Sequence, residues 1–208
     1  MSLFGRRGAA AERRGTPADL LVVGLANPGK DFAGTRHNLG ADAVRLVASR
    51  HGGTFRRGKE RAEVAEVRID DLRVALAIPH TYMNLSGESV APLVKRHGID
   101  DPEKLLIVHD ELDLPAGRLK VKRGGGLAGH NGLRSIKAHL HTDGFLRIRI
   151  GIGKPPGGKE QGANHVLRRP GKREQTELDI VVEEAADAIE AIATDGIEAT
   201  MTKFNARA

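Results

Sequence analysis

Short apolar runs, bounded by turn-forming residues, recur along the chain and predict six strands. Residues 19–25 and 105–108 are nearly continuous apolar runs, which are typical of strands buried on both faces of a sheet. Two later segments alternate between basic and apolar side chains, so each predicted strand has one basic face. The predicted strands are 19–25, 62–69, 72–78, 105–108, 118–122 and 145–152, and Asp70-Asp71 turns the second and third into a hairpin.

Between these strands, apolar residues recur at helical spacing. This spacing predicts helices over 38–50, 86–97, 131–139 and 174–193, with a short last helix ending near Phe204. Ser86 is expected to cap the second helix, and 174–193 to carry an acidic outer face. Residues 153–162, rich in Gly, Pro and Lys, predict a mobile surface loop. Strands interleaved with helices predict an α/β fold: a single-domain sandwich with a twisted mixed β-sheet flanked by helices.

The chain has 208 residues, which favours one folded domain, expected over residues 19–208. Residues 1–18 mix Arg pairs with Ala and Gly, and we expect a flexible tail on a cytoplasmic protein; an Arg-rich organelle transit segment is the alternative. Cys is absent, which excludes disulfides, thiolate metal sites and a Cys nucleophile. No apolar run approaches the roughly 18 residues of a membrane span, so no membrane contact is expected.

Positive charge is concentrated in one segment. The net charge is +6, yet residues 117–150 contain eight Lys or Arg against a single acid, Asp143, which leaves the rest of the chain near −1. A glycine-rich stretch lies within this segment. Concentrated basic charge around glycines favours a phosphate-rich partner over a merely solvated surface.

The glycine-rich stretch itself formally matches two nucleotide motifs. Gly124-x-Gly126-x-x-Gly129 has the spacing of a dinucleotide fingerprint, but the strand before it is too charged to be the buried strand which that fingerprint follows. The spacing also fits a P-loop, yet His130-Asn131 stands where Lys-Ser/Thr is required. Both nucleotide interpretations are therefore weak.

Candidate chemistry follows the buried strands. His37, with Asn27 and Asn38 nearby, lies on the loop after the first strand, where a neutral imidazole can deprotonate water. The segment 109–113 carries three carboxylates, which can hold Mg²⁺, orient His37 through Asp110, or simply form a turn. With no Cys and no nucleophile-elbow Ser, a hydrolase built on these residues would use water directly.

Four separated stretches then match one family in order and spacing, and they closely resemble bacterial-type peptidyl-tRNA hydrolases over about residues 20–204. The stretches are Gly24-Leu25-Ala26-Asn27-Pro28-Gly29 with Thr35-Arg36-His37-Asn38-Leu39-Gly40, Thr81-Tyr82-Met83-Asn84-Leu85-Ser86-Gly87, His109-Asp110-Glu111-Leu112-Asp113-Leu114-Pro115, and Gly124-Gly125-Gly126 through Gly129-His130-Asn131-Gly132-Leu133-Arg134-Ser135.

The resemblance implies a monomeric esterase, with no metal or other cofactor, that cleaves the ester between a peptide and the 3′-terminal ribose of tRNA. It implies that His37 is the general base, that Asp110 orients it, and that no covalent intermediate forms. The residues implied around the peptide and the CCA end are Asn27, Phe32, Met83, Asn84, His130 and Asn131. Candidates for phosphate contacts along the acceptor stem are Lys120, Lys122, Arg134 and Arg149.

Two positions depart from the family pattern: Phe32 stands where Tyr is more usual, and Leu127-Ala128 replaces glycine-richer residues. Neither changes the implied base, carboxylate or asparagines. Two other functions stay open at this point, a nucleotide-dependent α/β enzyme and a non-catalytic RNA-binding domain.

Overall fold

The structure is a computed structural model, and it describes residues 17–155, 157 and 161–206. The predicted tail, residues 1–18, lies outside the described residues except for Pro17 and Ala18. Part of the predicted loop over residues 153–162 also lies outside them.

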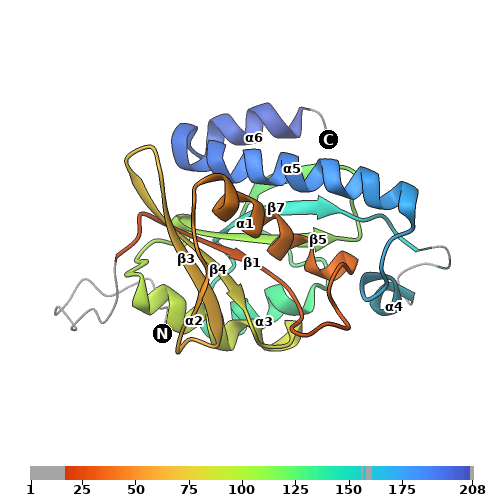
Figure 1. Cartoon of the computed structure of the whole chain (residues 1–208), viewed down its shortest axis with the longest axis horizontal. Helices are drawn as coiled ribbons and strands as arrows, with labels where there is room; N and C mark the ends of the chain where they lie inside the picture. The colour runs from red at the N-terminus through yellow and green to blue at the C-terminus, as the bar shows by residue number, and fades with distance from the viewer. Residues whose placement is uncertain (1–16, 156, 158–160, 207–208) are drawn as a thin grey trace.

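Seven strands form one mixed sheet, which confirms the predicted α/β class (Figure 1). The strands are β1 Leu20–Gly24, β2 Arg56–Arg57, β3 Ala62–Ile69, β4 Leu72–Pro79, β5 Leu105–Glu111, β6 Leu119–Arg123 and β7 Leu146–Gly151. Their order is β2-β3-β4-β1-β5-β7-β6. The four central strands are parallel, whereas β3 and β6 run antiparallel to their neighbours. The carboxyl ends of β1 and β5 therefore meet side by side at one edge of the sheet.

Helices cover both faces of the sheet. They are α1 Leu39–Arg50, α2 Ser86–Arg96, α3 Asn131–Leu140, α4 Gly162–Val166, α5 Lys172–Asp195 and α6 Ile197–Asn205, with 3₁₀ turns η1 Arg36–Asn38, η2 Met83–Leu85 and η3 Pro102–Lys104. The helices α5 and α6 lie over one face and α2 and α3 over the other, as Figure 1 shows. The short helix α4 lies beyond the carboxyl end of β5.

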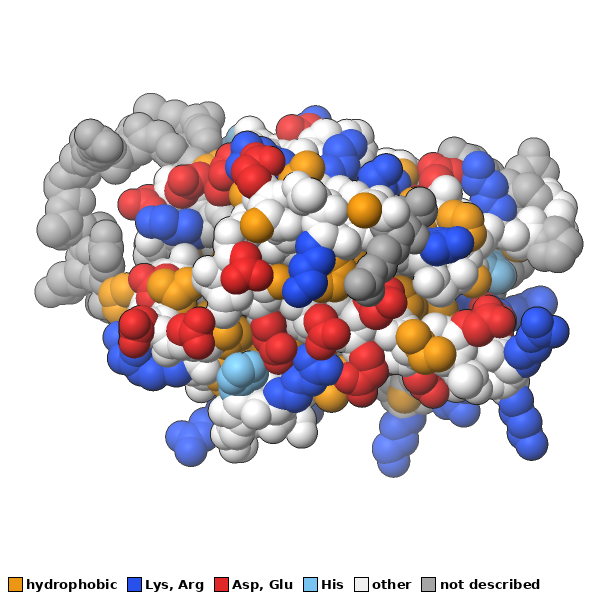
Figure 2. All heavy atoms as spheres, turned by 90° about the horizontal axis from the view of Figure 1, so that it is seen from above, with side chains coloured by type: hydrophobic (Ala, Val, Ile, Leu, Met, Phe, Trp, Pro, Cys, Tyr) orange, Lys and Arg blue, Asp and Glu red, His pale blue; other side chains and the backbone are white. Residues whose placement is uncertain are grey.

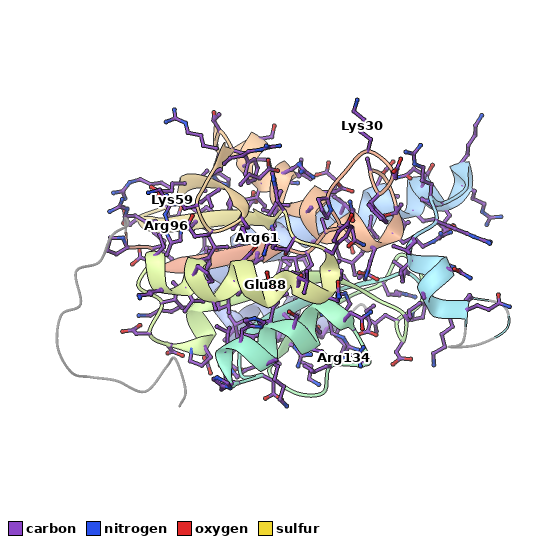
Figure 3. All side chains as sticks on the ribbon, turned by 90° about the horizontal axis from the view of Figure 1, so that it is seen from below. Lys30, Lys59, Arg61, Glu88, Arg96 and Arg134 are labelled. Atoms are coloured by element: carbon purple, nitrogen blue, oxygen red, sulfur yellow. The ribbon has the colours of Figure 1, made fainter. Side chains whose placement is uncertain are left out.

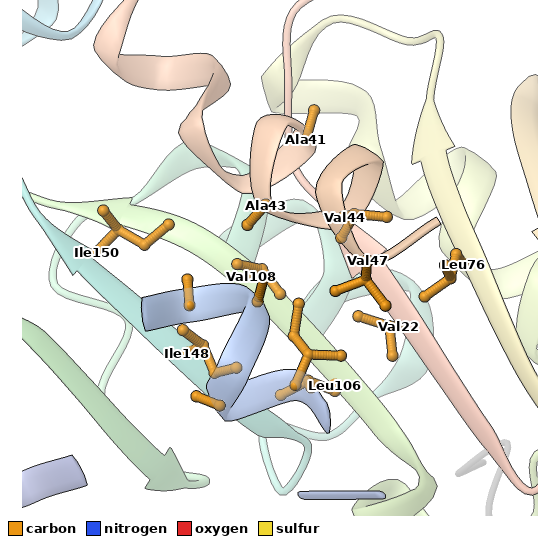
Figure 4. Packing of buried hydrophobic residues seen from close by; sticks show 14 of the residues in the cluster. Val22, Ala41, Ala43, Val44, Val47, Leu76, Leu106, Val108, Ile148 and Ile150 are labelled. Carbon is orange, nitrogen blue, oxygen red and sulfur yellow. The ribbon is translucent and has the colours of Figure 1, made fainter. Parts of the chain in front are cut away.

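Alternating side chains of the central strands divide the core into two layers. In β1, Val22 packs with α1 and α5 on one face, while Leu21 and Val23 pack with α2 and α3 on the other. Figure 4 shows the first layer, where Val44 and Val47 of α1 meet the sheet. Because both faces are buried, the continuous apolar runs seen in the sequence are the pattern that such strands require.

The helix α1 packs unusually close to the sheet at Gly40. A Cβ atom at Gly40 would lie 2.2 Å from the carbonyl oxygen of Val108. We expect Gly40→Ala to destabilise the fold by about 3 kcal/mol, because a backbone atom cannot move aside and the overpacking cost exceeds the helix propensity gained. Urea unfolding monitored by circular dichroism measures this. The control is Gly171→Ala, where nothing lies within 4 Å of the added atom; equal midpoints for the two variants would contradict the close-packing argument.

The structure differs from the elements predicted from the sequence at several places. Ser86 is not a helix cap: it lies inside α2, after the 3₁₀ turn η2, and its hydroxyl donates to the carbonyl of Met83. A turn over 109–113 is also wrong for its first three residues, since β5 continues through Glu111. The strand β2 and the helix α4 were not predicted, because two and five residues are too few to show a period.

The outer surface of α5 is acidic as predicted, but its charge is locally balanced. Arg50 of α1 forms ion pairs with Glu183, Asp187 and Glu190. Figure 2 looks onto this side of the molecule and shows acidic and basic side chains interspersed. Within the described part of the chain, no helix combines the length and apolar character needed to cross a bilayer.

Candidate active site

Two side chains from distant parts of the chain meet at the carboxyl edge of the sheet. His37 lies in η1, just after the loop that follows β1, and Asp110 is the penultimate residue of the strand β5. The Nδ1 atom of His37 is 2.7 Å from Oδ1 of Asp110, and both residues are buried. A buried carboxylate accepts hydrogen bonds, so Nδ1 carries the proton and the lone pair of Nε2 is left available.

His130 is a second donor to the same carboxylate oxygen. It is the N-cap residue of α3, where its Nδ1 accepts hydrogen bonds from the amides of Gly132 and Leu133 at 3.1 and 3.4 Å. Since Nδ1 is the acceptor, the proton is on Nε2, which lies 3.2 Å from Oδ1 of Asp110. The helix cap therefore fixes the tautomer of His130, and Asp110 holds both imidazole rings.

The electrostatics of this group follow from its burial and its contacts. Burial acts to lower the pKa of His37, but the charge of Asp110 and its hydrogen bond outweigh burial, and the pKa lies above the ordinary histidine value. Burial alone would raise the pKa of Asp110, yet His37 and His130 together hold it far below its usual range. Asp110 therefore stays ionised, and His37 is the group of this pair that titrates.

His109, next to Asp110 in the chain, is fully buried, and its ring contacts the backbone of Asp110 instead of its carboxylate. Its Nδ1 is 2.7 Å from the carbonyl oxygen of Asp110, and its ring packs edge-on against His130 at 4.9 Å. Burial, then the proximity of His130, holds the pKa of His109 well below the ordinary value. His109 is thus a neutral packing partner of His130, a role that the sequence did not reveal.

A cavity of about 270 Å³ opens over the two imidazoles. His37, Asp110, His130 and Asn131 line it on one side, and α4 closes the other side with small and apolar residues. Arg36 fixes that wall: its guanidinium forms a bidentate ion pair with Glu174 at 2.6 Å and donates to carbonyls of His165 and Arg168. Arg36 directly precedes His37, so the same loop carries the histidine and holds the wall opposite it.

Asn27 lies three residues after the end of β1 and is held in one orientation. Its backbone exchanges two hydrogen bonds with the side chain of Asn38, and its Oδ1 accepts from the amide of Met83 at 2.8 Å. Its Nδ2 is thereby left as the free donor of the amide. Asn27 lines a neighbouring cavity of about 350 Å³ rather than the cavity over His37.

The other residues implied around the peptide differ in exposure. Asn84 is exposed in η2, while the side chain of Met83 is 3% exposed and belongs to the hydrophobic core. Met83 therefore contributes its backbone amide to this region, not its side chain. Phe32 is half-buried and packs edge-on against exposed Tyr82 at 6.3 Å.

The predicted basic residues divide between two places. Arg134, labelled in Figure 3, lies on α3 and donates to Oδ1 of Asn131, so it orients that amide. Lys120 and Lys122 share one face of β6 with Arg149 of β7, because Lys120 and Arg149 are cross-strand partners. Arg149 is partly neutralised by an ion pair of 3.0 Å with buried Glu111, whereas the two lysines form no ion pair among the described residues.

The glycine-rich stretch is built around a cation. Arg147 of β7 is 1% exposed, and its guanidinium donates to the carbonyls of Gly124, Gly125 and Gly126. A dinucleotide loop turns its glycines toward a ligand, whereas here three successive glycine carbonyls accept from a side chain of the protein itself. The stretch therefore does not have the arrangement of a dinucleotide loop, in agreement with the argument from the sequence.

One group of described residues has the ligand types of a metal site. The ligand atoms of His37, Asp110 and His130 lie within 4.8 Å of one another. In the structure, however, Oδ1 of Asp110 accepts from both imidazoles, and Nδ1 of His130 is used by the cap of α3. These contacts already occupy Oδ1 of Asp110 and both ring nitrogens of His130, and they leave Nε2 of His37.

Fold and site together define a single-domain α/β enzyme with a carboxylate-oriented histidine at the carboxyl edge of its sheet. The family model described as peptidyl-tRNA hydrolase matches residues 21–208, and the chain belongs to this family. A relative from Frankia alni is 47% identical over 89% of this chain and 93% of its own length. One from Mycolicibacterium gilvum is 47% identical over 90% and 97%. The crystal structure of peptidyl-tRNA hydrolase from Acinetobacter baumannii superposes with a TM-score of 0.84 at 38% identity, covering 95% of this chain and 98% of that one.

Proposed function

We propose that this protein hydrolyses the ester joining a peptide to the 3′-terminal ribose of tRNA, and so recycles tRNA from prematurely released peptidyl-tRNA. Membership of the family supports the substrate class. The observation that carries the chemistry is the hydrogen bond from Nδ1 of His37 to Asp110, which leaves Nε2 as a base beside a cavity. The enzyme acts as a monomer without a metal or other cofactor.

In the proposed reaction water is the nucleophile. Nε2 of His37 takes a proton from water while the oxygen attacks the ester carbonyl, and the positive charge that forms on the imidazole is stabilised by Asp110. The tetrahedral intermediate then collapses. The bond between the carbonyl carbon and the ribose oxygen breaks, and His37 returns the proton to that oxygen. The products are a tRNA with a free 3′-terminal ribose and a peptide carboxylic acid, which releases the second proton of the water to solvent on ionising; no covalent enzyme intermediate forms.

The asparagine amides supply donors around this reaction. The Oδ1 atoms of Asn27 and Asn131 are occupied by Met83 and Arg134, so each amide presents Nδ2 outward. A preorganised amide donor stabilises the oxyanion of a tetrahedral intermediate. We assign Asn27 and exposed Asn84 to the peptide side, and His130 and Asn131 to the water and the terminal adenosine. Phe32 and Tyr82 flank the peptide side as an aromatic pair.

The acceptor stem is proposed to lie along β6 and β7. Neutralising phosphates releases counterions, so affinity for tRNA should fall steeply with salt. We expect Lys120→Gln and Lys122→Gln each to lessen the slope of log affinity against log salt by about one. Lys203→Gln, an exposed lysine on α6, is the matched control and should leave the slope unchanged. A slope that the two β6 substitutions do not alter would reject this surface as the tRNA contact.

The decisive test of the function compares two substrates. Purified protein is incubated with N-blocked peptidyl-tRNA and with unblocked aminoacyl-tRNA, and release of free tRNA is followed. Rapid cleavage of the blocked substrate supports the proposal. If neither substrate is cleaved while tRNA still binds with micromolar affinity, a non-catalytic RNA-binding role replaces the esterase; saturable binding of NAD or ATP would instead favour a nucleotide-dependent enzyme.

A chelator tests the alternative use of the histidine–carboxylate group. Dialysis against EDTA is expected to leave cleavage of peptidyl-tRNA unchanged, because the base is an imidazole that acts directly on water. Loss of activity that returns on adding Zn²⁺ or Mg²⁺ would show instead that His37, Asp110 and His130 are metal ligands.

A further inference from the structure

The buried guanidinium of Arg147 is not needed for the chemistry described above, yet it lies under the loop that delivers two site residues. Gly124 pairs with Phe145 at the amino end of β7, whereas His130 lies beside Asp110 at the carboxyl end of β5. Residues 124–130 must therefore run back along the sheet, and Arg147 is the residue over which they pass.

Three successive carbonyls converge on this one side chain. Nη1 of Arg147 is 2.7 Å from the oxygen of Gly126, and Nη2 is 2.6 Å from that of Gly125 and also contacts that of Gly124. Gly124 and Gly125 have φ angles of +54° and +94°, a backbone region in which glycine is favoured. A planar guanidinium presents several donors in a fixed fork, which matches three converging carbonyls as a lysine ammonium cannot.

Among the described residues, Asp143 and Glu111 act on the charge of Arg147 only from beyond ion-pair distance. Within the described part of the chain no carboxylate forms an ion pair with it, and its Nε has no hydrogen-bond partner. Burial, and then the charge of Arg149, lowers its pKa from the usual arginine range. A buried cation without an ion-pair partner is costly, and apolar residues of similar volume commonly serve stability as well or better. The presence of a buried arginine at this position is better explained by the single loop conformation that its hydrogen bonds impose.

That conformation has consequences at the active site. The loop ends at His130, whose amide donates to Leu127 and whose ring then caps α3 and contacts Asp110. Asn131 follows as the first residue of α3. A shift of the loop would therefore move both residues together, and a misplacement of about 1 Å can cost about a hundredfold in rate.

We propose that Arg147 is a positioning residue, which shapes residues 124–126 so that His130 and Asn131 stand beside the His37–Asp110 pair. This inference rests on the proposed function for its kinetic readout. It adds a residue that does not touch the substrate, and it explains why glycines and a buried arginine occur together.

The test uses Arg147→Lys and Arg147→Ala in the full-length protein. We expect Arg147→Lys to lower kcat on peptidyl-tRNA about a hundredfold with little change in KM, because the active site is misaligned while the tRNA surface remains. For Arg147→Ala, millimolar guanidinium is expected to restore a large part of kcat, whereas ammonium or urea at the same concentration is not. The matched control is Arg123→Ala, an exposed arginine of β6 paired with glutamates, and it should keep wild-type kcat.

A second measurement does not depend on activity. Trypsin should cut after Arg123 faster in Arg147→Ala than in the wild type, because the adjacent loop is no longer held. Wild-type kcat in Arg147→Lys, or unchanged cleavage after Arg123, would overturn the proposal. If the wild-type protein proves inactive on peptidyl-tRNA, the proposed function fails, and the proteolysis result still decides whether Arg147 holds the loop. Should Arg147→Ala fail to fold, Gly125→Ala tests the same loop: its kcat should fall likewise, and an unchanged kcat would overturn the proposal.

Discussion

Replacing His37 with alanine is expected to lower kcat/KM for peptidyl-tRNA by about 10³-fold, within the range that general-base catalysis supplies. Of the two imidazoles that contact the carboxylate of Asp110, His37 is the one with a ring nitrogen free to act on water, since both nitrogens of His130 are committed to hydrogen bonds. Binding of tRNA should persist, because the lysines of β6 are untouched. Single-turnover hydrolysis and a filter-binding assay measure the two effects separately.

The control for this variant is His51→Ala. His51 is a half-buried histidine at the C-terminal end of α1, where it pairs with Glu190 of α5. It does not line the cavity over His37. Its replacement should leave hydrolysis unchanged. Turnover by His37→Ala within a few-fold of wild type would eliminate His37 as the base, provided that the urea midpoints of the two variants agree.

Much of the fold could be predicted because the sheet is buried on both faces. The runs 19–25 and 105–108 have no polar residue facing either layer, and they became the adjacent strands β1 and β5. Polar residues that directly follow such strands fall at one edge of a parallel sheet. That rule predicts Asn27, His37 and Asp110 at the same edge of the sheet, although His37 and Asp110 are 73 residues apart in the chain.

The other features of the site depend on contacts between side chains that no local sequence pattern encodes. The segment 109–113 had three interpretations from sequence, and only the position of His37 and His130 around Asp110 distinguishes them. Arg147 was expected on a basic strand face, but the glycine loop covers its part of that face and buries its side chain. The period-two alternation placed Arg147 and Arg149 on one side correctly; it carries no information on what covers that side.

Arg36 is a second case of this kind. The sequence assigns no role to Arg36 beside the implied base, and in the structure its guanidinium forms a bidentate ion pair with Glu174, 138 residues later in the chain. Such long-range pairing supports the wall of the cavity formed by α4, which was itself too short to predict. Sequence patterns thus located the reacting groups, whereas the groups that hold them in place required the tertiary structure.

Asp110→Asn is expected to change both the rate and its pH dependence. In the wild type, hydrolysis requires neutral His37, so the rate rises with pH through the pKa of this imidazole, which lies above the ordinary histidine value. The carboxylate is what raises it, while burial acts in the opposite direction. Removing the charge leaves burial unopposed, so the pKa of His37 should fall and the acid limb of the profile should move to lower pH.

The maximal rate should fall at the same time, by about 10²-fold, because a weaker base accepts the proton less readily and the imidazolium loses its counter-charge. The two effects have opposite consequences at low pH, where the variant keeps more of its base in the neutral form. Asp187→Asn, which removes an exposed carboxylate of α5 that does not line the cavity, is the control and should leave the profile in place. An acid limb of Asp110→Asn that stays fixed or moves to higher pH would mean that Asp110 does not set the pKa of the catalytic base.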